Sequence, residues 1–261
     1  WPLVALVAVV SVLGVRELLD FAARQEIRPP RALALVTAAL LAPLCYLSIT
    51  DPDVTMAVLV WWPYAAAVWL VGLLTWVLAT RSPAQRPLTS AAVTILAVLY
   101  AGALPAFLLV LRHGGYGTRS WAGTWLVFFP LVVTWVCDTA AMFGGRAIGG
   151  PKLAPTVSPG KTRSGSTVGV AGGLVVAVIF AWAVFPRLGI AVSLPALLAM
   201  ALVWSIMGQA GDLVESLFKR EIGVKDSSAL IPGHGGVLDR FDSLYFVIPL
   251  AAVMYRLFGL A

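Results

Sequence analysis

Long apolar runs alternate with polar interruptions along almost the whole chain. Many of the runs reach about 20 residues, the length that a helix needs to cross a bilayer. Two interruptions are long and polar, at 144–165 and 212–241. The pattern predicts an all-α fold, a polytopic bundle of membrane helices. It predicts eight helices, at residues 1–22, 32–50, 54–80, 88–111, 121–143, 166–185, 188–211 and 242–260.

The chain contains no internal repeat and no linker typical of a separate soluble domain. We therefore expect residues 1–261 to form a single integral-membrane domain, with N-terminal helices in 1–137 and catalytic helices and loops in 138–261. The sequence begins at Trp1 rather than at a methionine, which leaves open whether a preceding helix is missing. A cleaved signal peptide is not expected, because a basic start and a small-residue cleavage site are absent.

Composition supports a bilayer as the natural solvent. The residues are 60% hydrophobic and 11% charged, whereas soluble domains carry about 25% charged residues. Cys45 and Cys137 lie within apolar runs without metal-ligand spacing, so we interpret them as buried, unreactive thiols. The net charge of +6 does not indicate a nucleic-acid partner, because the basic residues are distributed according to membrane topology.

Basic residues are concentrated in alternate interruptions. Fourteen of the 18 Lys and Arg residues lie in 16–31, 81–87, 144–165 and 212–241, and three lie in the interruptions between them. Cytoplasmic loops of membrane proteins carry such an excess. The asymmetry predicts a protein of the bacterial cytoplasmic membrane whose two long loops, and hence the active site, face the cytoplasm.

One predicted helix end carries a polar stripe. Asp212, Glu215, Ser216 and Lys219 are spaced i, i+3, i+4 and i+7, which places them on one side of a helix. A charge inside a membrane helix costs about 2.5–3.5 kcal/mol on the insertion scale. Two carboxylates on one such face therefore indicate chemistry or a compensating partner.

Three further acids lie near helix ends. Asp138 ends one apolar run, and Asp239 and Asp242 open the last one. Converging carboxylates provide the hard oxygen ligands that Mg²⁺ prefers, with phosphates and water completing its shell. The alternative for any single acid is a helix cap or a nearby ion pair, such as Asp239 with Arg240. That alternative explains the whole group less well than it explains one member.

Two other stretches have features suited to phosphate. "SPGKTRSGS", at 158–166, combines hydroxyls with Lys161 and Arg163 before a helix start, where the helix dipole favours an anion. "PGHGGVLDR", at 232–240, places glycines around His234, so backbone can approach a ligand closely. Neither has the spacing of a nucleotide-binding P-loop. A basic loop flanking the membrane and a structural histidine remain the alternatives.

The stretch "SLFKREIGVKDSSALIPGHGGVLDRFD" resembles the signature of the phosphatidate cytidylyltransferase family, also called CDP-diacylglycerol synthase. Its fixed positions are Ser216, Lys219, Arg220, Lys225, Asp226, Pro232, His234, Gly235, Gly236, Asp239, Arg240 and Asp242. "DTAAMFGGR" and "SPGKT" are similar to two upstream elements of the family, so the resemblance covers about 138–243. One position departs, because Ser164 stands where the family usually has Glu.

The resemblance implies a Mg²⁺-dependent membrane enzyme that condenses CTP with phosphatidic acid. As metal ligands it suggests Asp212 and Asp239, with Asp138, Glu215 and Asp242 as further candidates. As phosphate or nucleotide contacts it suggests Ser158, Lys161, Thr162, Arg146, Gly235 and Gly236. As catalytic residues it suggests Lys219, Arg220, Lys225, Asp226, His234 and Arg240. Asp226 would hold either Lys225 or the cytosine amine.

Alternative functions and partners stay open at this point. A related nucleotide-dependent lipid enzyme with another lipid acceptor shares the same charge logic. A membrane transporter also places acids in helices, but here the acids gather near one membrane face and none lies mid-span. A second cation such as K⁺ beside Mg²⁺ and a homodimer are likewise undecided by the sequence.

Overall fold

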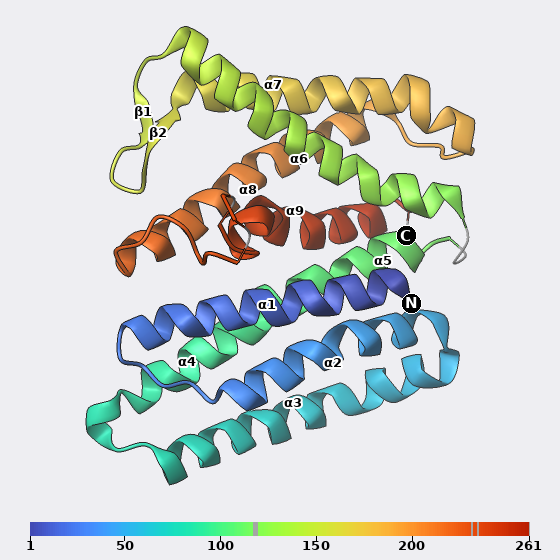
Figure 1. The fold of residues 1–261 in the computed structure, drawn as a ribbon. Coiled ribbons are helices and arrows are strands. Elements are labelled where there is room, and N and C mark those ends of the chain that lie inside the picture. Colours follow the sequence, from blue (N-terminus) through green and yellow to red (C-terminus); the bar gives the residue numbers. More distant parts are fainter. Residues whose placement is uncertain (117–119, 231, 234, 261) are drawn as a thin grey trace. The chain divides into compact units, whose positions relative to one another are not determined.

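The computed structural model describes residues 1–116, 120–230, 232–233 and 235–260 (Figure 1). Helices dominate it, which confirms the predicted all-α class. A single two-stranded antiparallel sheet, β1 (Lys152–Ala154) with β2 (Ser158–Thr162), is present in the described part of the chain. The chain divides into two compact units, residues 1–110 with 222–240 and residues 111–221 with 241–261.

The first unit is built from the N-terminal helices and the loop at 222–240. Its elements are α1 (Pro2–Arg24), α2 (Arg31–Thr50), α3 (Pro52–Thr80), η1 (Pro83–Gln85), α4 (Pro87–Ala97), η2 (Val98–Ala103), η3 (Leu104–Ala106) and the start of α5 (Phe107–His113). Helix α3 begins two residues earlier than predicted, because Asp51 accepts from the backbone N–H groups of Asp53 and Val54 and Pro52 suits the first turn.

Packing in the first unit centres on α1. Val4 and Val7 of α1 share a buried cluster with Ala42 of α2 and Leu109 of α5. The Ser11 hydroxyl donates to the carbonyl of Gly102 at 3.1 Å, which satisfies a polar group inside the apolar region. Helix α1 is thus a buried central element of this unit.

The second unit holds α6 (Trp121–Ile148), the β1–β2 hairpin, α7 (Arg163–Ile179), η4 (Phe180–Val184), η5 (Pro186–Leu188), α8 (Leu194–Glu221) and most of α9 (Leu238–Leu257). The hairpin joins α6 to α7 (Figure 1). Phe129, Phe180, Phe185 and Trp204 form an aromatic cluster in this unit, in which three of the four ring pairs are edge-to-face and the pair Phe129–Phe180 is tilted.

Helices α6 and α7 pack closely through small residues. Gly165, Gly169 and Gly173 recur every four residues along α7. A Cβ at Gly169 would lie 2.8 Å from the Cys137 carbonyl oxygen and 2.9 Å from the Ala141 side chain. Small residues allow this approach between membrane helices, where dispersion and packing replace the hydrophobic effect as the driving force.

Seven helical segments are long and apolar enough to cross a membrane, counted over the described residues. They are Pro2–Arg24, Arg31–Thr50, Pro52–Thr80, Pro83–His113, Trp121–Ile148, Arg163–Val184 and Leu194–Glu221. They overlap seven of the eight predicted spans. The span predicted at 188–211 is displaced, because α8 covers Leu194–Glu221 and the first ten residues of the predicted loop 212–241 are helical. The eighth, 242–260, forms helix α9 but is not among the seven; Asp239, Arg240, Asp242 and Arg256 lower its apolar character. The division of 1–261 into 1–137 and 138–261 stays a prediction.

We predict that Gly169→Ala destabilises the second unit. The added methyl group meets backbone and a short side chain that cannot rotate away, and overpacking of this kind costs about 1–3 kcal/mol. Thermal unfolding in detergent should show a lower midpoint. Gly72→Ala is the control, because an added Cβ there meets nothing within 4 Å. Equal midpoints for the two variants would contradict the close contact.

Candidate active site

In the second unit, three aspartates from three helices lie near enough for their charges to interact. Asp138 lies on α6, Asp212 on α8 and Asp242 on α9. The charge of Asp138 interacts with those of Asp242, Asp212 and Lys161, and Asp242 also interacts with Asp212. The structure thus brings together three of the predicted metal ligands and one predicted phosphate contact, across more than a hundred residues of sequence.

The close crossing of α8 and α9 accounts for the Asp212–Asp242 interaction. A Cβ at Gly211 would lie 2.7 Å from the Asp242 carbonyl oxygen, and one at Gly208 would lie 3.3 Å from the Val247 side chain. Only glycine permits this separation at Gly211. Backbones this near bring the two short aspartate side chains close enough for their charges to interact strongly.

An amide one turn before Asp212 ties α8 to its neighbours. Gln209 Nε2 donates to the carbonyl of Ser205 at 3.1 Å and to that of Ser166, on α7, at 3.4 Å, and it lies 3.6 Å from Cys137 Sγ on α6. Gln209 is buried. Gln209 was not among the residues predicted from the sequence, although a lone amide within an apolar helix is a recognisable sign of a buried polar contact.

The β1–β2 hairpin places Lys161 at the aspartates. Lys161 Nζ donates to Asp212 Oδ2, and the Ser216 hydroxyl donates to Asp212 Oδ1 at 3.3 Å. Arg220 Nε donates to the carbonyl of Val157 at 3.2 Å, which holds the end of α8 to the hairpin turn. Asp212 therefore has a cation and a hydroxyl as partners, and Lys161 faces a carboxylate.

The remaining residues of the hairpin region have structural contacts. The Thr162 hydroxyl accepts from the backbone N–H of Gly165 and so caps α7, which begins three residues before the predicted position. Ser164, at the position where Glu is usual, donates to the carbonyl of Gly149 at the end of α6. Ser158 is half-buried in β2, and Arg146 is exposed on α6.

Glu215 and Lys219 form an ion pair along α8. The Nζ–Oε1 distance is 3.3 Å, and the Glu215 side chain is almost wholly inaccessible. An ion pair is the alternative that the sequence left open for this acid. The stripe that the spacing predicts is present, and its two halves have different partners: Asp212 contacts Lys161, and Glu215 contacts Lys219.

Asp239 lies in the first unit, near the end of the loop at 222–240, which we call the signature loop. Its carboxylate accepts hydrogen bonds from other residues of this loop. Its Oδ2 accepts from the backbone N–H and the hydroxyl of Ser227, both at 2.7 Å, and from the N–H of Gly236 at 2.8 Å. Gly235 has a φ of +78° and a Cβ there would lie 2.5 Å from Asp239 Oδ2, so glycine is required. Lys225, Asp226 and Arg240 are exposed, and His234 lies outside the described residues.

Another carboxylate, which sequence analysis missed, contacts the same loop. Glu17 of α1 is 3% exposed and accepts hydrogen bonds from Ser227, Ser228, Val237 and Leu238. The sequence did contain a sign of this role, because Glu17 follows Arg16 directly and lies between the apolar residues Val15 and Leu18. The charge pattern of 16–31 drew attention to its arginines instead.

In the described part of the chain, no three Asp, Glu, His or Cys side chains stand as a ready-made metal site. The ligand set predicted from the sequence, Asp212, Asp239, Asp138, Glu215 and Asp242, therefore stays a prediction. Asp138, Asp212 and Asp242 lie near enough for their charges to influence one another, and Lys161 contacts Asp212.

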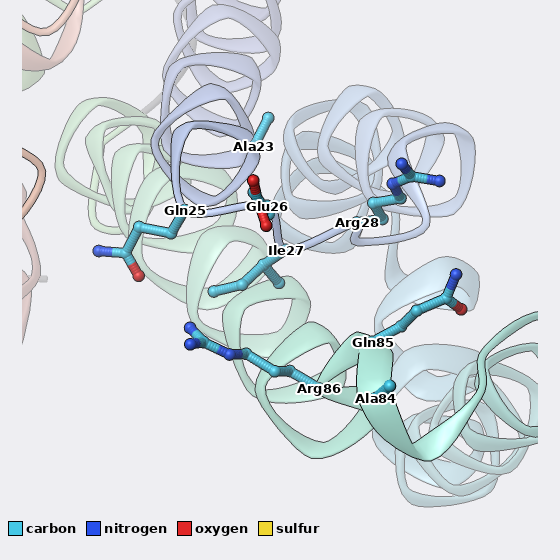
Figure 2. Close-up of a pocket in the computed structure, with 8 residues that line it drawn as sticks. All are labelled: Ala23, Gln25, Glu26, Ile27, Arg28, Ala84, Gln85 and Arg86. Carbon is cyan, nitrogen blue, oxygen red and sulfur yellow. The ribbon is translucent and has the colours of Figure 1, made fainter.

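One cavity is lined by none of these residues. It has a volume of about 610 Å³ and opens between the α1–α2 connection and η1, with Gln25, Glu26 and Arg28 on one side and Gln85 and Arg86 on the other (Figure 2). Its lining includes no residue that the sequence singles out as catalytic or metal-binding.

Comparison with known proteins points to one family. Phosphatidate cytidylyltransferases of Staphylococcus saprophyticus subsp. saprophyticus and Staphylococcus haemolyticus are each 45% identical to this chain over 139 residues. That of Staphylococcus aureus is 42% identical over the same length. Each alignment covers 53% of this chain and 52% of the relative, so the chain spans about half the length of the curated relatives it matches.

A model of the cytidylyltransferase family matches a much larger part of the chain, residues 1–258. The match includes the N-terminal helices, which carry no recognisable motif, as well as the signature. It confirms the resemblance drawn from residues 138–243. Since the match extends over nearly every residue, the chain belongs to the cytidylyltransferase family.

Proposed function

We propose that this protein transfers the cytidylyl group of CTP to phosphatidic acid, forming CDP-diacylglycerol and pyrophosphate in a Mg²⁺-dependent reaction. The observation that carries the proposal is the gathering of Asp138, Asp212 and Asp242 with Lys161. Asp138, Lys161 and Asp242 come from segments that resemble the family motifs, and Asp212 lies four residues before the signature. The names of the relatives support the same substrates.

The reaction depends on neutralising the phosphate charges of the two substrates more than on acid–base catalysis. An oxygen of the lipid phosphate attacks the α-phosphorus of CTP, the bond from that phosphorus to the bridging oxygen of the β-phosphate breaks, and pyrophosphate leaves. A lipid phosphate is already ionised at neutral pH, so a strong general base is unnecessary. Holding two polyanions in line and neutralising them supplies most of the catalysis.

The aspartate group fits a divalent cation. Lys161 contacts Asp212, and its single positive charge is outnumbered by the three carboxylates that it influences. The excess negative charge and the hard oxygen donors suit Mg²⁺. Asp138, Asp212 and Asp242 would hold the ion. When bound, Mg²⁺ supplies charge neutralisation on the phosphate oxygens of the nucleotide.

Basic side chains would complete the neutralisation. Lys161 lies beside Asp212, and Lys219 and Arg220 end α8 in the same unit. Lys225 and Arg240 are exposed in the signature loop of the first unit. From the distribution of Lys and Arg we propose that these groups face the cytoplasm, where CTP is present, and that the lipid enters laterally from the inner leaflet.

A direct assay tests the proposed reaction. Purified protein in detergent is incubated with labelled CTP, phosphatidic acid and Mg²⁺, and the products are separated. Formation of CDP-diacylglycerol with an equal amount of pyrophosphate is the expected result. Consumption of CTP only with another lipid acceptor, or ion flux through liposomes without nucleotide turnover, would instead support one of the alternative functions.

We predict that Asp212→Asn lowers the rate of CDP-diacylglycerol formation by at least roughly 100-fold, the scale for removing one preorganised charged group. The same loss is expected for Asp239→Asn. Thermal unfolding should show both variants to be folded. Asp53→Asn is the control, since Asp53 is exposed at the start of α3. Near-normal turnover in Asp212→Asn would remove this residue from the proposed metal set.

We predict that Lys161→Gln raises the KM for CTP by roughly 10-fold or more, because a phosphate contact loses its charge. Lys152→Gln, on the neighbouring strand of the same hairpin, is a matched control with an exposed lysine. Initial rates over a range of CTP concentrations give the comparison. If both variants show the KM of the unsubstituted protein, Lys161 only balances Asp212.

A further inference from the structure

Glu17 is a buried acid far in sequence from the loop that it contacts. Its Oε1 accepts from the Ser228 hydroxyl at 2.7 Å and from the Val237 N–H at 3.0 Å. Its Oε2 accepts from the Ser227 hydroxyl and from the Leu238 N–H, both at 2.9 Å. The partners are 210 to 221 residues away. All contacts lie within the first compact unit.

The four donors explain how an acid is tolerated at this position. A buried carboxylate is strongly unfavourable unless hydrogen bonds or cations compensate it. Here both oxygens receive two neutral donors each, which is close to the acceptor capacity of the group. Val237 and Leu238 stand at the start of α9, where free N–H groups and the helix dipole favour a negative charge. Glu17 therefore acts as an N-terminal cap supplied by another helix.

The contact between Glu17 and the loop leaves no space for a side chain at Gly236. A Cβ at Gly236 would lie 2.3 Å from Glu17 Oε1 and 2.1 Å from the Ser227 hydroxyl oxygen, so the loop can close on Glu17 only with glycine there. The Ser227 hydroxyl also lies 2.7 Å from Asp239 Oδ2. Its one proton is shared between the two carboxylates, which couples Glu17 to Asp239 through a single side chain.

We propose that Glu17 is a positioning residue for the reaction: by accepting hydrogen bonds from Ser227, Ser228, Val237 and Leu238, it fixes the part of the loop that holds Asp239, on which the proposed reaction depends. The inference rests on the proposed function. Ser227, Ser228 and Glu17 lie outside the fixed positions of the family signature, so the signature loop depends on a helix that the motif does not contain.

Glu17→Gln is the test variant. It keeps the size of the side chain but replaces one acceptor oxygen with an NH₂ group, which then meets a donor N–H and a hydroxyl. The expected result is faster hydrogen–deuterium exchange of backbone amides in 227–240, with exchange in α2 and α3 unchanged. We also expect the KM for CTP to rise about 10-fold, at the low end of losses from removing a supporting group, while kcat changes less.

Two further variants make the experiment specific. Asp20→Asn removes an acid from the same helix, where Asp20 is half-exposed and pairs with Arg31, and it should match the unsubstituted protein in exchange and in KM. Ser228→Ala removes one of the four donors and should raise the KM less than Glu17→Gln. The variant with both substitutions, Glu17→Gln and Ser228→Ala, should have the same KM for CTP as Glu17→Gln alone, because both substitutions break the same contact.

The outcomes separate the two proposals. Unchanged exchange in 227–240 of Glu17→Gln would overturn the positioning role, and so would faster exchange with a CTP KM equal to that of the unsubstituted protein. If Glu17→Gln does not fold, unchanged exchange and KM in Ser228→Ala overturn the role. Absence of CDP-diacylglycerol from the unsubstituted protein would refute the proposed function alone, and the exchange data would still decide whether Glu17 holds the loop.

Discussion

A carboxylate within an apolar helix is stable only where the protein surrounds it with donors or cations, and this constraint organises both compact units. Glu17 receives four neutral donors from a loop more than two hundred residues away. Asp212 and Glu215 each have a lysine. Each acid therefore favours the fold in which a segment with donors or a cation packs against it, because burying the carboxylate without such partners costs too much free energy.

Close helix packing is the second requirement of the aspartate group. Gly211 lets α9 approach α8, and the glycines of α7 let it approach α6. Gln209 then links three helices one turn from Asp212. The position of the carboxylates therefore depends on backbones that bulkier residues would separate.

The same electrostatics connect the site to the proposed chemistry. A group with excess negative charge, flanked by Lys161, is suited to a cation that in turn attracts phosphates. Membership of the cytidylyltransferase family and the names of its staphylococcal relatives make CTP and phosphatidic acid the natural substrates to test. The alternative of individually capped acids describes Glu215 well, but it does not describe three aspartates that interact with one another.

The sequence by itself determined the membrane fold, the family and most helix positions to within a few residues, because apolar length and motif spacing are local properties of the chain. It placed the end of α8 ten residues too early, because the polar stripe from Asp212 to Lys219 continues the helix beyond its apolar part. It also singled out five acids: Asp239, Glu215 and the three aspartates Asp138, Asp212 and Asp242. Only the tertiary structure decided that these three interact, that Lys161 joins them through a hairpin and that Glu17 holds the signature loop. Such partners are distant in sequence, and which donor reaches which acid depends on how helix backbones pack rather than on local pattern.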